Sequence, residues 1–158
     1  MDTLAEYEKS LRDLIKGRSR LPSDDGYFAQ VALSPGLVVM QESAVWWLAM
    51  AVQRHCVWTV RLLKRLGTFH SCVAAFYRER SPSPYAEKAA EQFLDHTSEF
   101  GESLARTLAG FELAVQRVRR GDMEEYCIEW DRNPDTVFAC LLSGAELPAP
   151  EAGSHYLT

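Results

Sequence analysis

Residues 124–144 read EEYCIEWDRNPDTVFACLLSG and decide the fold, because their pattern differs from that of the segments before them. Tyr126, Ile128 and Trp130 alternate with Cys127 and Glu129, a period of two that is typical of a half-buried strand. A helix should follow, since an asparagine caps free backbone donors and a proline suits the first helical turn. The two start signals are Asn133 and Pro134. The buried stripe of the helix is expected to be Val137, Phe138, Leu141 and Leu142.

The chain before this stretch repeats apolar residues every three or four positions, as amphipathic helices do. The clearest stripe is Leu104, Leu108, Phe111, Val115 and Val118. Further helices are predicted over 2–16, 37–66, 68–80 and 85–100, with the second bent or broken at some point. Thr68 is expected to cap the third, and Tyr85 to lie on the apolar side of the fourth. Residues 27–33 fit a short helix or an extended piece.

The expected fold class is therefore mainly α, an antiparallel helical bundle with a small α+β element at the carboxyl end. We expect the bundle to occupy residues 1–121 and the strand-helix-strand element to occupy residues 122–158. Residues 154–158, SHYLT, are the candidate second strand of that element. A two-stranded ribbon alone is marginal in water, so a further strand or ligand is expected to complete it.

Composition limits the function classes. The 158 residues carry a formal net charge of −5, which argues against a general nucleic-acid binder. The four cysteines form no CxxC pair, so neither disulfides nor a zinc site is expected. No segment approaches the roughly 20 apolar residues of a membrane span, and the acidic N-terminus is unlike a signal peptide. We expect a cytoplasmic protein without a membrane partner.

Catalytic signals are missing from the sequence. None of the four histidines follows a glutamate by three residues, as the histidines of di-iron bundles do. Nucleophile-elbow, dinucleotide and phosphate-loop motifs are also absent. Glu112 lies at the edge of an apolar stripe, where a buried salt bridge to an arginine is the simplest expectation. We predict no catalytic residue and no metal ligand in this chain.

Two features indicate a partner. Trp46 and Trp47 are adjacent, so one helix cannot bury both rings against one neighbour, and one ring is expected at an interface. Arg61 begins the basic run RLLKRLG, which either neutralises the end of a helix or contacts a partner. Trp46, Trp47 and Arg61 are thus the candidate partner interface.

A family resemblance covers residues 34–96, 104–122 and 124–144. Their pattern resembles the small partner subunits of multinuclear non-haem iron oxidases that modify ribosomally made peptides, and most resembles the partner of the 3-thiaglutamate pathway. In that pathway the enzyme complex acts on the carboxyl-terminal cysteine of a carrier peptide. The resemblance rests on pattern over most of the chain after residue 34.

The resemblance implies a heterodimer in which the large, barrel-shaped oxidase subunit holds the iron, so no cofactor belongs to this chain. It also implies a peptide-recognition element that receives a precursor or carrier peptide. An extended peptide can add to a free strand edge, with backbone hydrogen bonds giving affinity. The candidate peptide-binding residues are Glu125, Tyr126, Cys127, Ile128, Glu129 and Trp130, with Val137 and Leu141 on the following helix.

Recognition sheets of this kind usually have three strands. Either residues 27–40 supply one, or the sheet is incomplete within this chain. Three alternatives remain open: the strand pairs with SHYLT and merely covers one end of the bundle; the chain is a stand-alone helical regulator with a winged element that binds nucleic acid or protein; or it is a bundle enzyme with its own metal.

Overall fold

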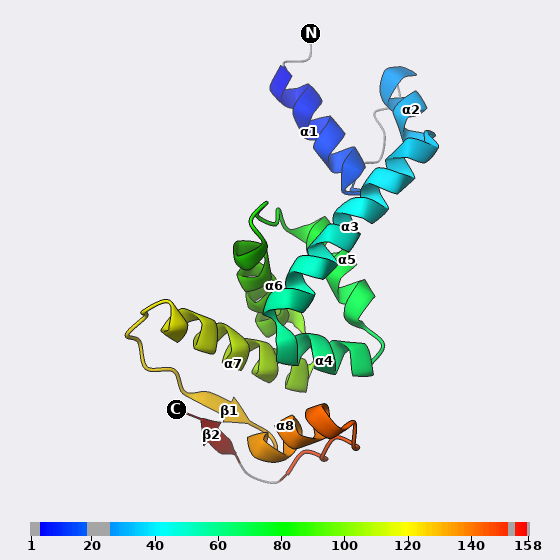
Figure 1. Cartoon of the computed structure of the whole chain (residues 1–158). Helices are drawn as coiled ribbons and strands as arrows, with labels where there is room; N and C mark the ends of the chain where they lie inside the picture. Colours follow the sequence, from blue (N-terminus) through cyan, green and yellow to red (C-terminus); the bar gives the residue numbers. More distant parts are fainter. Residues whose placement is uncertain (1–3, 19–25, 152–153, 158) are drawn as a thin grey trace.

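A computed structural model describes residues 4–18, 26–151 and 154–157. This part of the chain is mainly helical, with a small antiparallel sheet of two strands (Figure 1). In chain order the elements are α1 (Leu4–Ile15), α2 (Gly26–Ala32), α3 (Pro35–His55), α4 (Val57–Arg65), α5 (Phe69–Glu79), α6 (Ala86–Phe100), α7 (Ser103–Arg119), β1 (Ile128–Trp130), α8 (Pro134–Ser143) and β2 (His155–Leu157).

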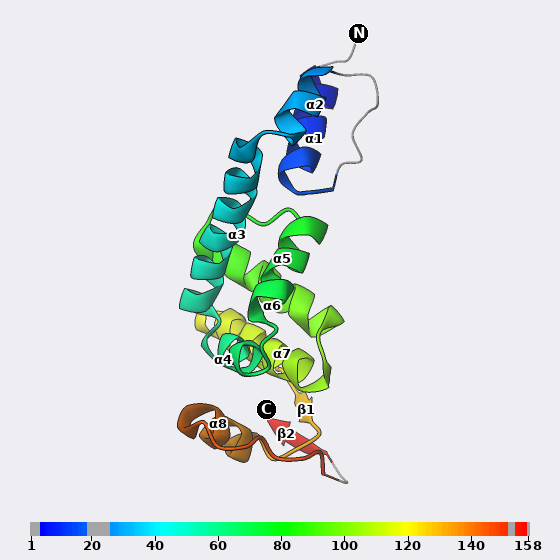
Figure 2. The ribbon, with the colours of Figure 1, turned by 90° about the vertical axis from the view of Figure 1, so that its right-hand side faces the viewer.

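The first and last elements of the chain lie at opposite ends of the molecule (Figures 1 and 2). Figures 1 and 2 both show α1 and α2 beside the first turns of α3, whereas β1, α8 and β2 lie at the opposite end. The main core is formed by residues of the five helices from α3 through α7 together with the carboxyl-terminal element, which contributes Trp130, Val137 and Leu141. A separate small cluster around Leu14 and Leu37 holds α1 against α3.

The long predicted helix over 37–66 is broken, and the break lies at Cys56, between α3 and α4. A new helix start leaves free backbone donors, which need partners when they are buried. Glu112 of α7 supplies them, accepting hydrogen bonds from the Trp58 amide (3.0 Å) and the Thr59 amide (2.9 Å). On the other side of the break, Gln116 Nε2 donates to the His55 carbonyl at 2.9 Å. One face of α7 thus satisfies both sides of the break.

The expectation that Glu112 pairs with an arginine is therefore wrong, because its two oxygens are occupied by backbone amides. The residue is buried, and this burial raises the pKa of its carboxyl group, while the hydrogen bonds from Thr59 and Trp58 act in the opposite direction. Glu112 acts as a cap for α4 supplied from another helix.

Helix α8 starts as predicted. The Asn133 side chain accepts a hydrogen bond from the Thr136 amide at the start of α8, and Pro134 is the first helical residue. β1 pairs antiparallel with β2, with Glu129 opposite Tyr156. Residues 126–130 alternate between more and less buried positions and end at fully buried Trp130. Strand pairing between these two segments, one of the arrangements expected from sequence, is confirmed.

Other expectations change. Residues 27–33 lie mostly in α2, and α3 begins at Pro35, so the suggestion that residues 27–40 supply a third strand is wrong. The Thr68 side chain makes no cap bond to α5; it donates instead to the Leu63 carbonyl. Tyr85 is exposed rather than buried along α6. The ends of the predicted 2–16 helix and of SHYLT, and most of the turn-rich connection between 17 and 26, lie outside the described residues.

Helix α3 is a longer apolar segment than expected from the sequence. Its length and apolar character are sufficient to cross a membrane, a criterion that core helices of water-soluble proteins also meet. The sequence-based statement that no segment approaches such a length does not hold for this helix.

Candidate functional site

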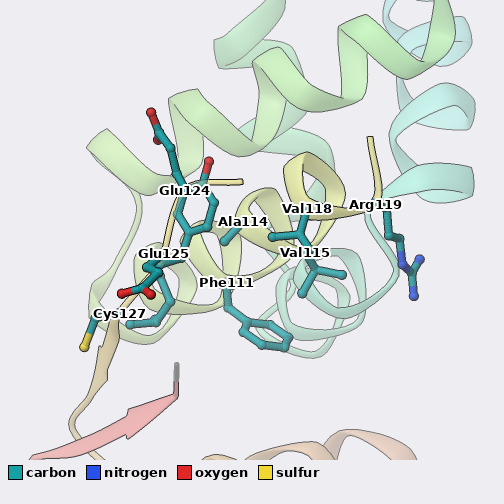
Figure 3. A pocket seen from close by; sticks show the side chains of 10 residues that line it. Phe111, Ala114, Val115, Val118, Arg119, Glu124, Glu125 and Cys127 are labelled. Carbon is teal, nitrogen blue, oxygen red and sulfur yellow. The ribbon is translucent and has the colours of Figure 1, made fainter. Parts of the chain in front are cut away.

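A groove of about 780 Å³ runs between α7 and the extended segment that leads into β1 (Figure 3). We call it the α7 groove. The helix contributes its floor and the segment contributes one wall, so residues from two different elements face a common space. Its lining residues are Phe111, Ala114, Val115, Val118, Arg119, Glu124, Glu125, Tyr126, Cys127 and Ile128.

The floor is the second half of the apolar stripe predicted for α7. Leu104 and Leu108 of that stripe are buried in the core, as expected. Phe111 packs against the core and also faces the groove, whereas Val118 is 53% exposed. The stripe therefore leaves the core near Phe111 and continues as an uncovered apolar surface. An exposed apolar surface beside a cavity is typical of a binding site.

Residues 124–127 of the wall are extended chain that precedes β1. The predicted strand over residues 125–130 is shorter, because β1 begins at Ile128. Within the described residues, Glu125 and Tyr126 form no backbone–backbone hydrogen bond, and β1 has one strand partner, β2. Unpaired extended backbone is a template for another strand.

A hydrogen bond anchors this wall to the end of α7. The Tyr126 hydroxyl donates to Asp122 Oδ2 at 2.5 Å. That bond raises the pKa of Tyr126 and lowers the pKa of Asp122, so both groups keep their neutral-pH charge states. The Asp122 carboxylate also accepts the Glu124 amide at 3.1 Å. The segment is held in an extended path and has no strand partner among the described residues.

The rim of the groove carries opposite charges. Glu124 and Glu125 are exposed on the wall, and Arg119 is exposed at the end of α7. Figure 3 shows the two glutamates and Cys127 on one side of the cavity and Arg119 on the far side. A bound chain would meet apolar side chains along the floor and charges at both edges.

Four of the eight predicted peptide-binding residues line the α7 groove, and four do not. Glu125, Tyr126, Cys127 and Ile128 line the α7 groove. Trp130 and Val137 are fully buried, and Trp130 packs edge-on against Phe111 and Phe138 beneath the groove floor. Glu129 and Leu141 do not line the groove; Glu129 is exposed and accepts a hydrogen bond from Ser154.

Sequence reasoning missed the floor residues Val115 and Val118 and the rim residues Arg119 and Glu124. A signal for the floor was present. The stripe of α7 continues with valines into a segment, RVRR, whose arginines mark a solvent-exposed helix end. Apolar residues that persist at helical spacing among exposed cations indicate a surface that another chain covers.

The predicted partner residues lie on two surfaces. Trp46 and Trp47 are 66% and 43% exposed on α3, where they form an uncovered face that we call the α3 apolar face. Its residues are Val39, Met40, Trp46, Trp47 and Met50. Arg61 is elsewhere, with its guanidinium over the Trp58 ring and beside α8. The three residues therefore do not share one cavity.

Metal ligands do not converge anywhere among the described residues: no group of three or more histidine, cysteine, aspartate or glutamate side chains is placed to hold an ion. The four cysteines are free thiols, and burial raises the pKa of Cys56 and of Cys72.

Comparisons of the chain with protein-family models, with curated protein sequences and with solved structures find no match.

Proposed function

We propose that this chain is a non-catalytic partner subunit that binds a precursor or carrier peptide and presents its carboxyl-terminal cysteine to a multinuclear non-haem iron oxidase. The observation that carries the proposal is the α7 groove, in which an uncovered apolar helix face lies beside unpaired extended backbone. The resemblance described above supplies the identity of the enzyme and the class of peptide.

In this proposal the peptide adds as an extended strand along residues 124–128. Its backbone would pair with every second residue of this segment, either Glu125 or Tyr126 first, and every second side chain of the peptide would face the floor of the groove. A preferred peptide therefore has apolar residues at alternate positions. A basic residue near Glu124 and Glu125 would find two exposed carboxylates.

The fold is proposed to separate peptide binding, in this chain, from the iron chemistry of the partner enzyme. The helices would form an antiparallel bundle that supports a strand-helix-strand recognition element, with the iron confined to the partner. The sheet would gain its third strand from the bound peptide. The α3 apolar face is the proposed docking surface for the oxidase, because exposed tryptophans are frequent anchors of interfaces.

The regulator alternative is less well supported. A winged nucleic-acid reader places a polar or basic helix in the groove of its target. Helix α8 has no basic residue in its last turn and buries Val137 and Leu141 against the core. Its composition suits a structural support better than a reading helix.

Peptide binding by the variant Val118→Glu tests the proposal. The probe is a fluorescently labelled peptide with apolar residues at alternate positions and a carboxyl-terminal cysteine, and its affinity is measured by anisotropy. A carboxylate on the apolar floor should weaken binding by about tenfold or more, since placing a charge against apolar groups is costly. Val118 is exposed, so folding should be unaffected.

Leu33→Glu is the matched control, because Leu33 is 86% exposed near α2 at the opposite end of the molecule. It should leave peptide affinity unchanged. Equal affinities for wild type and the folded Val118→Glu variant would remove the groove from the proposal.

A further inference from the structure

A second cleft, of about 460 Å³, lies between α4 and α8. We call it the α4–α8 cleft. One wall carries the cations Arg61, Lys64 and Arg65 of α4, and the other carries Leu141, Leu142 and Gly144 at the end of α8. It shares no lining residue with the α7 groove.

The cations of this cleft have no acidic partner among the described residues. Arg61 lies over the Trp58 ring, with its guanidinium carbon 5.4 Å from the ring centre. Lys64 donates to the neutral amide oxygen of Gln53, and Arg65 donates to the Cys140 carbonyl at 3.3 Å. In the part of the chain that the structure describes, no acidic side chain lines the cleft. The cleft therefore has a local excess of positive charge in a chain whose net charge is negative.

Helix-end neutralisation accounts for only part of this cluster. Arg65 caps a carbonyl of α8, whose own last turn has no basic residue. Arg61, however, lies in the middle of the nine-residue helix α4, where the helix dipole gives it no advantage. Arg61 and Lys64 are exposed and line the cleft, so their charges contribute to the positive field there.

The opposite wall is apolar. Leu142 is 63% exposed, whereas Leu141 beside it is buried, and both residues line the cleft. A ligand in this space would therefore meet positive charge on one side and leucine side chains on the other.

We propose that the α4–α8 cleft is a docking site for an acidic segment of a protein partner, one that carries glutamate or aspartate together with an apolar anchor. The carboxylates would pair with Arg61 and Lys64, and the anchor would pack on Leu142. This inference does not depend on peptide binding in the α7 groove.

A polypeptide fits the cleft better than a nucleic acid does. Single-stranded nucleic acid is held by a charged groove with exposed aromatic platforms, whereas the apolar wall here is formed by leucines. The negative net charge of the whole chain also opposes a long polyanion. A short acidic segment requires only the local positive field.

Binding of a labelled peptide of alternating glutamate and leucine, measured by anisotropy, tests the proposal. We expect the double variant Arg61→Glu/Lys64→Glu to weaken binding by about tenfold or more, since two attractions become repulsions. Leu142→Ser should weaken it as well. The matched control, Lys88→Glu/Arg106→Glu, makes the same charge change at exposed positions on α6 and α7 and should leave affinity near the wild-type value.

Three results would overturn the proposal: no binding of the peptide to wild type, an equal loss in the double variant and its control, or tighter binding of a single-stranded oligonucleotide than of the peptide. A version of the peptide with glutamine in place of glutamate should bind at least about tenfold more weakly. Val118→Glu should leave binding unchanged, so failure of the α7 groove and failure of this cleft are distinguishable.

Discussion

At the residue scale, Glu112 shows how one buried carboxylate fixes the path of the chain. It lies on α7 but caps the start of α4, more than fifty positions away in sequence. Its burial was predictable from the apolar stripe beside it. Its role was not, because the identity of a buried partner depends on which backbone donors the fold brings to that place.

Replacing Glu112 by alanine should lower the free energy of unfolding by about 1–3 kcal/mol at neutral pH, because two amides at a helix start lose their acceptor. Urea denaturation measures the change. Glu99→Ala is the control, since Glu99 forms an exposed pair with Arg80 and should cost less than about 1 kcal/mol.

The same variant has a pH signature. Burial raises the pKa of Glu112 above its value in the unfolded chain, so folding favours the protonated form. The stability from this group is complete below about pH 4.3 and falls as the pH rises through the raised pKa. The destabilisation caused by Glu112→Ala should therefore be larger near that pH than at neutral pH. A smaller difference at acidic pH would contradict the assignment.

At the scale of elements, periodicity predicted most helices but not what each helix face contacts. The spacing predicts one continuous apolar stripe on α7, yet the first half of the stripe is buried and its last residues line the α7 groove. Spacing alone cannot distinguish the buried half of the stripe from the exposed half, because both halves consist of apolar residues. The division depends on where the next segment, residues 122–127, crosses the helix.

The break at Cys56 has the same origin. Sequence favoured a bend somewhere in residues 37–66, but no proline or glycine marks the position. The break lies where Glu112 and Gln116 of α7 satisfy the interrupted backbone. Such a position follows from tertiary contacts rather than from local propensity.

Proline at Ile128 tests the extended element. Ile128 lines the α7 groove and begins β1, so Ile128→Pro removes a backbone donor at the proposed peptide edge. Precursor-peptide affinity should fall by about tenfold while the helical circular-dichroism signal is retained. Glu146→Pro, in the exposed loop after α8, is the control. Unchanged affinity in a folded Ile128→Pro protein would refute this placement of the peptide.

At the scale of the whole molecule, binding surfaces are separated along the chain. The α7 groove lies near the carboxyl-terminal end, and the α3 apolar face lies on the helix that leads toward α1 and α2 (Figure 1). The adjacent tryptophans predicted one exposed ring, whereas both are substantially exposed. The sequence of α3 alone cannot predict that both rings are exposed, because the burial of each ring depends on which neighbouring elements pack against α3.

Alanine at both Trp46 and Trp47 should weaken oxidase binding by about tenfold or more, since exposed tryptophans of this kind act as interface anchors. Affinity for the precursor peptide should not change. Tyr85→Ala, which removes another exposed aromatic ring, is the control. Full oxidase affinity in the double variant would place the docking surface elsewhere.

The most direct test of the central claim is co-purification of the tagged chain with the proteins encoded beside it, followed by mass spectrometry and metal analysis. The proposal predicts that an iron-loaded barrel protein is retained and that the chain purified alone holds almost no metal. A chain that purifies without such a partner, or that carries the iron itself, would contradict the assignment as a non-catalytic partner subunit.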